Sequence, residues 1–149
     1  MVWVFEVSWE VCNKVGGIYT VVRSKVPYML EAYKENYVLI GPYFAKKAEG
    51  EFVEALPPQN FKDAFERLRQ QGIICHYGSW MIPQKPKTIL VDFSSFTSQK
   101  NKIKSDLWNW FKIDSLGTQY FDFDEPVVWS TAVGMVLSEL GLPQSVVHC

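Results

Sequence analysis

Short apolar runs and longer amphipathic segments alternate along this chain. The runs have the length and composition of buried strands and occupy residues 2–5, 36–40, 73–77, 88–93 and 145–149. Apolar side chains recur at helical spacing over residues 17–33, 61–71 and 125–140. Because the strands are apolar without strict alternation, this order of elements predicts an α/β, Rossmann-like domain with a mainly parallel sheet and helices on both of its faces.

Prolines, glycines and polar stretches mark where the predicted elements end. Pro27 is expected to kink or break the first helix, because proline lacks the amide hydrogen that the helix needs. The second strand is expected to end at residues 41–43, which read Gly-Pro-Tyr. Residues 46–58 are polar and close with two prolines, which predicts a surface excursion or a short hairpin.

Lysines and aromatic residues are interleaved between residues 94 and 124, and three interpretations of this segment stay open. It could be a stacking groove for single-stranded nucleic acid, in which bases lie on the aromatic rings. It could bind sugar rings by the same kind of stacking. The interpretation that we favour is a solvated turn followed by a helix that packs Trp108 and Trp110 inward.

Acidic residues precede the last predicted helix. Asp124 and Glu125 come directly before Pro126, and proline in the first turn with acidic neighbours is ordinary capping chemistry. We therefore expect both carboxylates to cap this helix, with binding of substrate hydroxyls as the alternative.

Length, charge and cysteine content exclude several classes of protein. The 149 residues make one domain, and the 48% of hydrophobic residues exclude disorder. Fifteen basic and sixteen acidic residues give a charge of −1, which offers no general attraction for nucleic acid or membranes. Cys12, Cys75 and Cys149 are odd in number and lack C-x-x-C spacing, so we expect no disulfides and a reducing, cytoplasmic location.

Because the last strand reads as buried and cut off, we expect residues 1–149 to be a truncated N-terminal domain.

The loop after the first strand has the chemistry of a phosphate site. Lys14 stands two residues before Gly16 and Gly17, and the first helix is expected to begin at Gly17. Glycines let a ligand approach the backbone, and the amides at a helix N-terminus attract anions. An ordinary strand-to-helix turn with a solvated lysine is the alternative interpretation.

A longer pattern around this loop is more specific. Residues 5–21 read F-E-V-S-W-E-V-C-N-K-V-G-G-I-Y-T-V, which resembles the N-terminal motif of the animal, fungal and archaeal glycogen synthases. Bacterial glycogen and plant starch synthases carry a related K-T-G-G-L followed by aspartate in place of Thr20. D-F-D-E-P at residues 122–126 and V-V-H-C at residues 146–149 also resemble the family, so the similarity covers nearly the whole chain.

The resemblance implies a GT-B glycosyltransferase, of which this chain is the N-terminal, acceptor-side Rossmann-like domain. Such enzymes transfer glucose from a nucleotide-glucose donor, UDP- or ADP-glucose, to the non-reducing end of an α-1,4-glucan with retention of configuration. No metal and no cofactor are implied. The partners are the donor, the glucan and the C-terminal domain of the same enzyme, without nucleic acid or membrane.

The resemblance also implies roles for particular residues. Lys14 and the amides of Gly16 and Gly17 would stabilise the charge on the leaving pyrophosphate. Glu6 and Glu10 are expected at the mouth of the same loop, where one of them orients Lys14 or a sugar hydroxyl, unless Glu10 only balances surface charge.

His148 and Glu125 complete the set of candidate substrate-binding residues, although His148 is also explained as a structural residue at a strand end. The alternative function is a non-catalytic module that binds a nucleotide or a glucan. A dinucleotide-binding oxidoreductase is disfavoured, because G-x-G-x-x-G is missing after the first strand.

Overall fold

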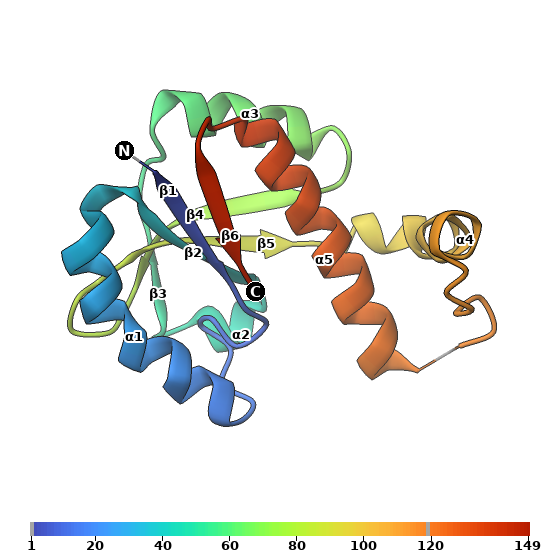
Figure 1. Ribbon diagram of the computed structural model, residues 1–149, viewed down its shortest axis with the longest axis horizontal. Coiled ribbons are helices and arrows are strands. Elements are labelled where there is room, and N and C mark those ends of the chain that lie inside the picture. Colours follow the sequence, from blue (N-terminus) through green and yellow to red (C-terminus); the bar gives the residue numbers. More distant parts are fainter. Residues whose placement is uncertain (1, 119) are drawn as a thin grey trace.

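A computed structural model describes residues 2–118 and 120–149 as an α/β domain (Figure 1). The elements, in chain order, are β1 (Trp3–Val7), α1 (Gly17–Tyr33), η1 (Lys34–Asn36), β2 (Tyr37–Pro42), α2 (Ala45–Ala48), β3 (Phe52–Glu54), α3 (Gln59–Arg69), β4 (Ile74–Trp80), β5 (Lys87–Asp92), η2 (Phe96–Gln99), α4 (Lys100–Phe111), α5 (Phe121–Leu140) and β6 (Ser145–His148). Each strand and helix predicted from periodicity is present, and the polar stretch after β2 holds α2 and β3.

The described strands form one sheet in the order β3-β4-β5-β2-β1-β6. The neighbours β5, β2, β1 and β6 run parallel, as predicted. β4 is antiparallel to β5, and β3 is antiparallel to β4, so these two strands form a hairpin-like extension of the parallel part. The prediction of a mainly parallel sheet is confirmed for the part of the sheet that starts at β5.

Helices cover both faces of the sheet, which confirms the predicted layers. Side chains alternate between the faces along a strand, and the core accordingly divides into two clusters. On one face Val38 and Ile40 of β2 pack with α3 and α5. On the other face Tyr37 and Leu39 of the same strand pack with α1.

Several element boundaries differ from the prediction. α1 continues through Pro27 without a break, and β2 includes Gly41 and Pro42 instead of ending before them. β1 extends to Val7, so Glu6 lies within the strand and not at the mouth of the loop. β2 is extended at its end by pairing with β5, in which Gly41 and Pro42 lie opposite Leu90 and Val91, whereas its pairing with β1 ends at Ile40.

The exposure of β6 also differs from the prediction. Its four residues are exposed, with Val146 and Val147 54% and 42% accessible. The strand lies at the edge of the sheet beside β1, and the packed clusters of the described residues do not include it. An apolar run predicts strand structure, but burial depends on what covers the strand, and this run is therefore not the buried strand that we expected.

α4 and the adjoining half of α5 project beyond the sheet (Figure 1). The expectation that α4 packs its tryptophans inward is wrong, because Trp108 and Trp110 are 44% and 70% exposed. The helix buries Ile103 and Lys104 instead. The physical reason is an ion pair with α5, described below, that turns the lysine face of α4 inward. None of the helices in the described ranges combines the length and the hydrophobicity that crossing a bilayer requires.

Candidate active site

The connections of the sheet reverse direction beside β1, which is the arrangement that leaves a crevice at the strand ends of open α/β sheets. From β1 the chain crosses through α1 to β2 on one side, and from β5 it crosses through α5 to β6 on the other side. In open α/β sheets, ligands bind at the carboxyl ends of strands at such a reversal of strand order. At this end Glu6 of β1 is paired in register with His148 of β6, and the chain leaves β1 for the lysine-glycine loop.

The lysine-glycine loop, residues 8–16, is seated on the neighbouring strand β2. A β-carbon placed on Gly41 would lie 2.5 Å from the carbonyl oxygen of Val11, which is far inside van der Waals contact. Only glycine at this position lets the loop approach β2 so closely. Asn13 braces the loop from within, since its side-chain amide donates to the carbonyl of Trp9 at 2.8 Å. The sequence marked Gly41 as a strand end and missed this role.

Glu10 occupies the N-terminus of α1. One oxygen of its carboxylate accepts the amide hydrogens of Gly16 at 2.8 Å and Tyr19 at 2.9 Å. Amides in the first turn have no acceptor within the helix, so Glu10 serves as a cap from outside it. Desolvation alone would raise the pKa of Glu10, but the hydrogen bonds from the Gly16, Tyr19 and Val15 amides, helped by Lys47, hold that pKa below its usual value.

This arrangement changes what the predicted phosphate site can do. The Gly16 amide, which we expected to face a phosphate, points to a carboxylate of the same protein. A phosphate at that amide would therefore compete with Glu10. Gly17 is the first residue of α1, and its amide is one of the donors that has no acceptor within the helix.

Lys14 is exposed at the surface of the loop. Its ammonium lies 5.8 Å from the centre of the Tyr19 ring, which is within the range of a cation–π contact. Its backbone carbonyl accepts a hydrogen bond from Lys47 at 3.2 Å. Among residues 2–118 and 120–149, none of the ion pairs involves Lys14. Neither Glu6 nor Glu10 is paired with it, so the ammonium remains available to an outside anion.

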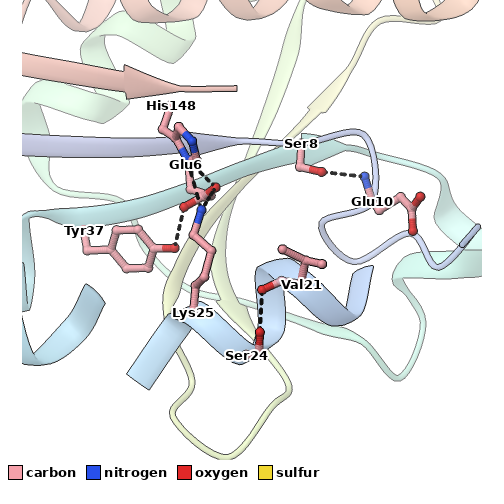
Figure 2. A network of polar contacts seen from close by, with 8 residues as sticks. All are labelled: Glu6, Ser8, Glu10, Val21, Ser24, Lys25, Tyr37 and His148. Atoms are coloured by element: carbon pink, nitrogen blue, oxygen red, sulfur yellow. Dashed lines mark hydrogen bonds and ion pairs between the residues drawn. The ribbon is translucent and has the colours of Figure 1, made fainter. Parts of the chain in front are cut away.

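Glu6 lies at the centre of a polar cluster at the ends of β1 and β6 (Figure 2). Its side chain is almost fully buried and accepts hydrogen bonds from Lys25 at 2.7 Å and Tyr37 at 3.2 Å. His148 lies 2.9 Å from the same carboxylate through Nδ1. Figure 2 shows that the Glu10 carboxylate points away from this cluster. Sequence reasoning found Glu6 and His148 but missed Tyr37 and Lys25, although Lys25 is three residues after the buried Val22 and so lies near the buried face of α1.

Glu125 occupies a different place. It lines a cavity of about 500 Å³ between α4, α5 and the segment that joins them. In this cavity Asp124 pairs with Lys104 at 2.5 Å and with Lys100 at 3.4 Å. α5 begins at Phe121, earlier than expected, and neither carboxylate makes a side-chain capping hydrogen bond. Asp124 lies in the first turn, where an acidic residue is favourable, but the expected capping role of Glu125 is wrong because it follows that turn. Burial raises the pKa of Glu125 above its usual value.

The structure therefore brings Lys14, Glu10, Gly16 and Gly17 together, joins Glu6 to His148, and separates Glu125 from both groups.

No group of three or more histidine, cysteine, aspartate or glutamate side chains in the described ranges is arranged to hold a metal ion.

An open α/β sheet whose strand order reverses at β1, with a Lys-x-Gly-Gly loop between β1 and α1, defines a Rossmann-like domain. The family model of glycogen synthase matches residues 6–146. The chain therefore belongs to the glycogen synthase family.

Individual relatives agree with this assignment. The liver glycogen [starch] synthase of Homo sapiens is 38% identical over 120 residues, which cover 79% of this chain and 16% of the relative. The glycogen [starch] synthase of Neurospora crassa is 37% identical over 137 residues, with 91% and 19% covered. Isoform 2 of Saccharomyces cerevisiae is 33% identical over 145 residues, with 91% and 20% covered. The chain thus spans a fifth or less of the length of these relatives.

Proposed function

We propose that the chain forms the acceptor-side part of the active site of a glycogen synthase, which transfers glucose from a nucleotide-glucose to an α-1,4-glucan with retention of configuration. Family membership over residues 6–146 supports this proposal. The remaining part of the site, including most nucleotide contacts, belongs to a second Rossmann-like domain in a GT-B arrangement. Three free cysteines, Cys12, Cys75 and Cys149, suit a reducing cytoplasm.

The proposal for the donor site rests on Lys14. Its ammonium is exposed at the carboxyl end of β1 beside the N-terminus of α1, without an ion-pair partner among the described residues. Negative charge develops on the pyrophosphate as the bond to glucose breaks, and a cation in this place stabilises the transition state more than the ground state. The Gly17 amide adds a donor, and the Gly16 amide joins it only when the ligand replaces the Glu10 carboxylate.

The acceptor side of the proposal uses the other candidate residues. His148 and the buried Glu6 stand at the strand ends that face the crevice, where a sugar hydroxyl can meet the exposed imidazole. Glu125 lies in a cavity lined with lysine, threonine and asparagine side chains beside Phe121 and Leu116. Hydroxyl-binding groups next to apolar surface suit a glucan chain, so we assign this cavity to glucan outside the reaction centre.

The decisive experiment replaces Lys14 in an intact enzyme that contains this domain. Lys14→Ala removes a charge-assisted hydrogen bond worth roughly 2–3 kcal/mol, which corresponds to a loss of about 30- to 150-fold in kcat/KM for the nucleotide-glucose. Lys14→Arg recovers only part, because a guanidinium differs from an ammonium in shape and hydration. The melting temperature should not change.

Lys46→Ala is the matched control, since Lys46 is an exposed lysine of α2. It should leave kcat/KM within about twofold of the parent, which is under roughly 0.5 kcal/mol. The proposal for the loop fails if Lys14→Ala behaves like this control, and a non-catalytic nucleotide- or glucan-binding module would then be the better description.

A further inference from the structure

Lys25 of α1 joins two residues that come from distant parts of the chain (Figure 2). Its ammonium lies 2.7 Å from Oε1 of Glu6 on β1 and 3.0 Å from Nδ1 of His148 on β6. Oε1 of Glu6 and Nδ1 of His148 are 2.9 Å apart. The three atoms therefore form a nearly equilateral triangle at the edge of the crevice.

The two contacts of Nδ1 in this triangle require opposite protonation states of that nitrogen. An ammonium can only donate hydrogen bonds, and an ionised carboxylate can only accept them. Lys25 is satisfied if Nδ1 of His148 carries a lone pair, whereas Glu6 is satisfied if the same nitrogen carries a proton. A neutral imidazole has one proton, so the balance of the two contacts decides which ring nitrogen bears it.

The number of available donors and acceptors favours a hydrogen bond from Lys25 to Nδ1 of His148 over one from Nδ1 to Glu6. Each oxygen of Glu6 already accepts a hydrogen bond, from Tyr37 at Oε2 and from Lys25 at Oε1. The ammonium has three hydrogens and uses one for Glu6, so a second can be donated to the nitrogen 3.0 Å away. Donation from Lys25 requires a lone pair on Nδ1, and the proton of the neutral ring then resides on Nε2.

We propose that Lys25 is a positioning residue that keeps the proton of neutral His148 on Nε2. Nδ1 faces Lys25 and Glu6, so Nε2 lies on the side of the ring that faces away from this cluster. The His148 side chain is 59% exposed. His148 therefore presents a hydrogen-bond donor, and not an acceptor, to a ligand oxygen at the carboxyl end of β6. The tautomer does not depend on the proposed function; only the ligand, a sugar hydroxyl or a phosphate oxygen, rests on it.

The tautomer can be measured in this chain directly. The sequence contains two histidines, His76 and His148, so His76→Gln leaves a single imidazole to observe. Long-range ¹H–¹⁵N correlation spectra distinguish a proton on Nδ1 from one on Nε2, and they are recorded on the alkaline plateau of the ring shifts. We expect the His76→Gln chain to show the proton on Nε2. A proton on Nδ1 in this chain overturns the proposal without any further variant.

Variants at position 25 test the cause. In the same background, Lys25→Met leaves Glu6 as the remaining partner of Nδ1 among the described residues, and the proton should move to Nδ1. Lys25→Arg keeps a cationic donor and should return the proton to Nε2. Lys62→Met is the matched control, because Lys62 is an exposed lysine on α3, against the opposite face of the sheet. Circular dichroism checks that each variant is folded. A folded Lys25→Met chain with the proton still on Nε2 contradicts the proposal.

Activity separates this inference from the proposed function. In an intact enzyme, Lys25→Met should lower kcat/KM about tenfold, the effect of misplacing one hydrogen bond, and Lys25→Arg should recover most of it. A rate that falls with Lys14→Ala but not with Lys25→Met would uphold the proposed function and overturn the positioning role. A tautomer that moves as expected, together with rates insensitive to both lysines, would instead overturn the proposed function of the crevice.

Discussion

Two glutamates four residues apart have entirely different surroundings. Glu6 is buried at the end of β1 with Lys25, Tyr37 and His148 around it, whereas Glu10 caps α1 from the loop. The sequence identified both as candidates, because both precede Lys14 within the motif at residues 5–21. It could not distinguish them, since the Glu6 carboxylate is directed by side chains from α1, β2 and β6 that are distant along the chain. The Glu10 carboxylate turns instead to the nearby amides at the start of α1. Their roles toward a substrate remain predictions.

Glu10 gives a prediction about pH at the residue scale. Its folded pKa is lower than the unfolded value of about 4.3. The stability that it contributes is therefore complete above that value and is lost as the pH falls through the folded pKa. Glu10→Gln keeps an oxygen for the amides of Gly16 and Tyr19 but removes the charge, so it should lower the melting temperature at pH 7 by about 2–4 °C.

Thermal unfolding followed by circular dichroism at pH 7 and near pH 3 measures this effect. The difference between the parent and Glu10→Gln should shrink as the pH falls through the folded pKa of Glu10, because the parent carboxyl then loses its charge as well. A difference that is the same at both pH values would mean that the charge of Glu10 does not stabilise α1. Glu10→Ala, which removes the acceptor as well, should be destabilised at both.

The cysteines give a second prediction at this scale. Burial raises the pKa of the Cys75 thiol to about 12 and raises that of Cys12 as well, so neither thiol is ionised near pH 8. The thiolate is the reactive form, and Cys149 is the exposed thiol among the three. We expect one thiol to react promptly with a disulfide reagent in the folded chain at pH 8, and three after denaturation without reductant. Fewer than three in the denatured chain would reveal a disulfide and contradict the cytoplasmic assignment.

At the scale of elements, local periodicity predicted most of the fold. The 3.6-residue spacing of α1, α3 and α5 and the apolar runs of the strands are local signals, and each identified an element within a few residues of its observed ends. Antiparallel pairing of β4 was not predictable, because pairing direction depends on the hairpin with β3 and on β5. The orientation of α4 was not predictable either, since it is fixed by a single residue on α5.

That residue is Asp124, which holds α4 against α5. Lys104 is 1% exposed and is paired with Asp124; it also donates a hydrogen bond to the carbonyl of Thr118. The Lys104 and Lys100 contacts outweigh desolvation and hold the pKa of Asp124 below its usual value. A buried cation explains why the amphipathic pattern failed for this helix: the polar residue faces inward, and the apolar residues are displaced toward solvent.

This pair gives a prediction at the scale of elements. Lys104→Met leaves the carboxylate of Asp124 with the longer contact to Lys100, and losing the closest partner of a largely buried charge is strongly destabilising. We expect the melting temperature to fall by about 10 °C. The double variant Lys104→Met with Asp124→Leu should recover most of this loss, because replacing both partners by apolar residues leaves no buried charge. A single variant as stable as the parent would show that the ion pair does not hold α4 against α5.

At the scale of the whole molecule, the topology decides where a ligand can bind. Strand order reverses at β1, and this arrangement brings His148 beside Glu6 from the two ends of the chain, at the end of β1 where the lysine-glycine loop begins. The sequence predicted the loop from its motif, but the pairing of β6 with β1 was visible only in the structure. The cavity that Glu125 lines lies on the projecting arm of α4 and α5, away from the ends of β1 and β6.

The last prediction concerns the chain of 149 residues by itself. Two opposite unit charges about 4 Å apart, such as Lys14 and a phosphate, attract each other by roughly 1 kcal/mol in water. The same attraction is about 4 kcal/mol at an effective dielectric constant near 20. In the proposed two-domain site, this stabilisation depends on a crevice closed on its second side, and this chain, which spans a fifth or less of these relatives, would provide one side. We expect no incorporation of radiolabelled glucose into glycogen from UDP- or ADP-glucose by the chain alone, with an intact family member as the positive control. Measurable turnover by the chain, abolished by Lys14→Ala, would show that these residues are sufficient and that the two-domain site is wrong.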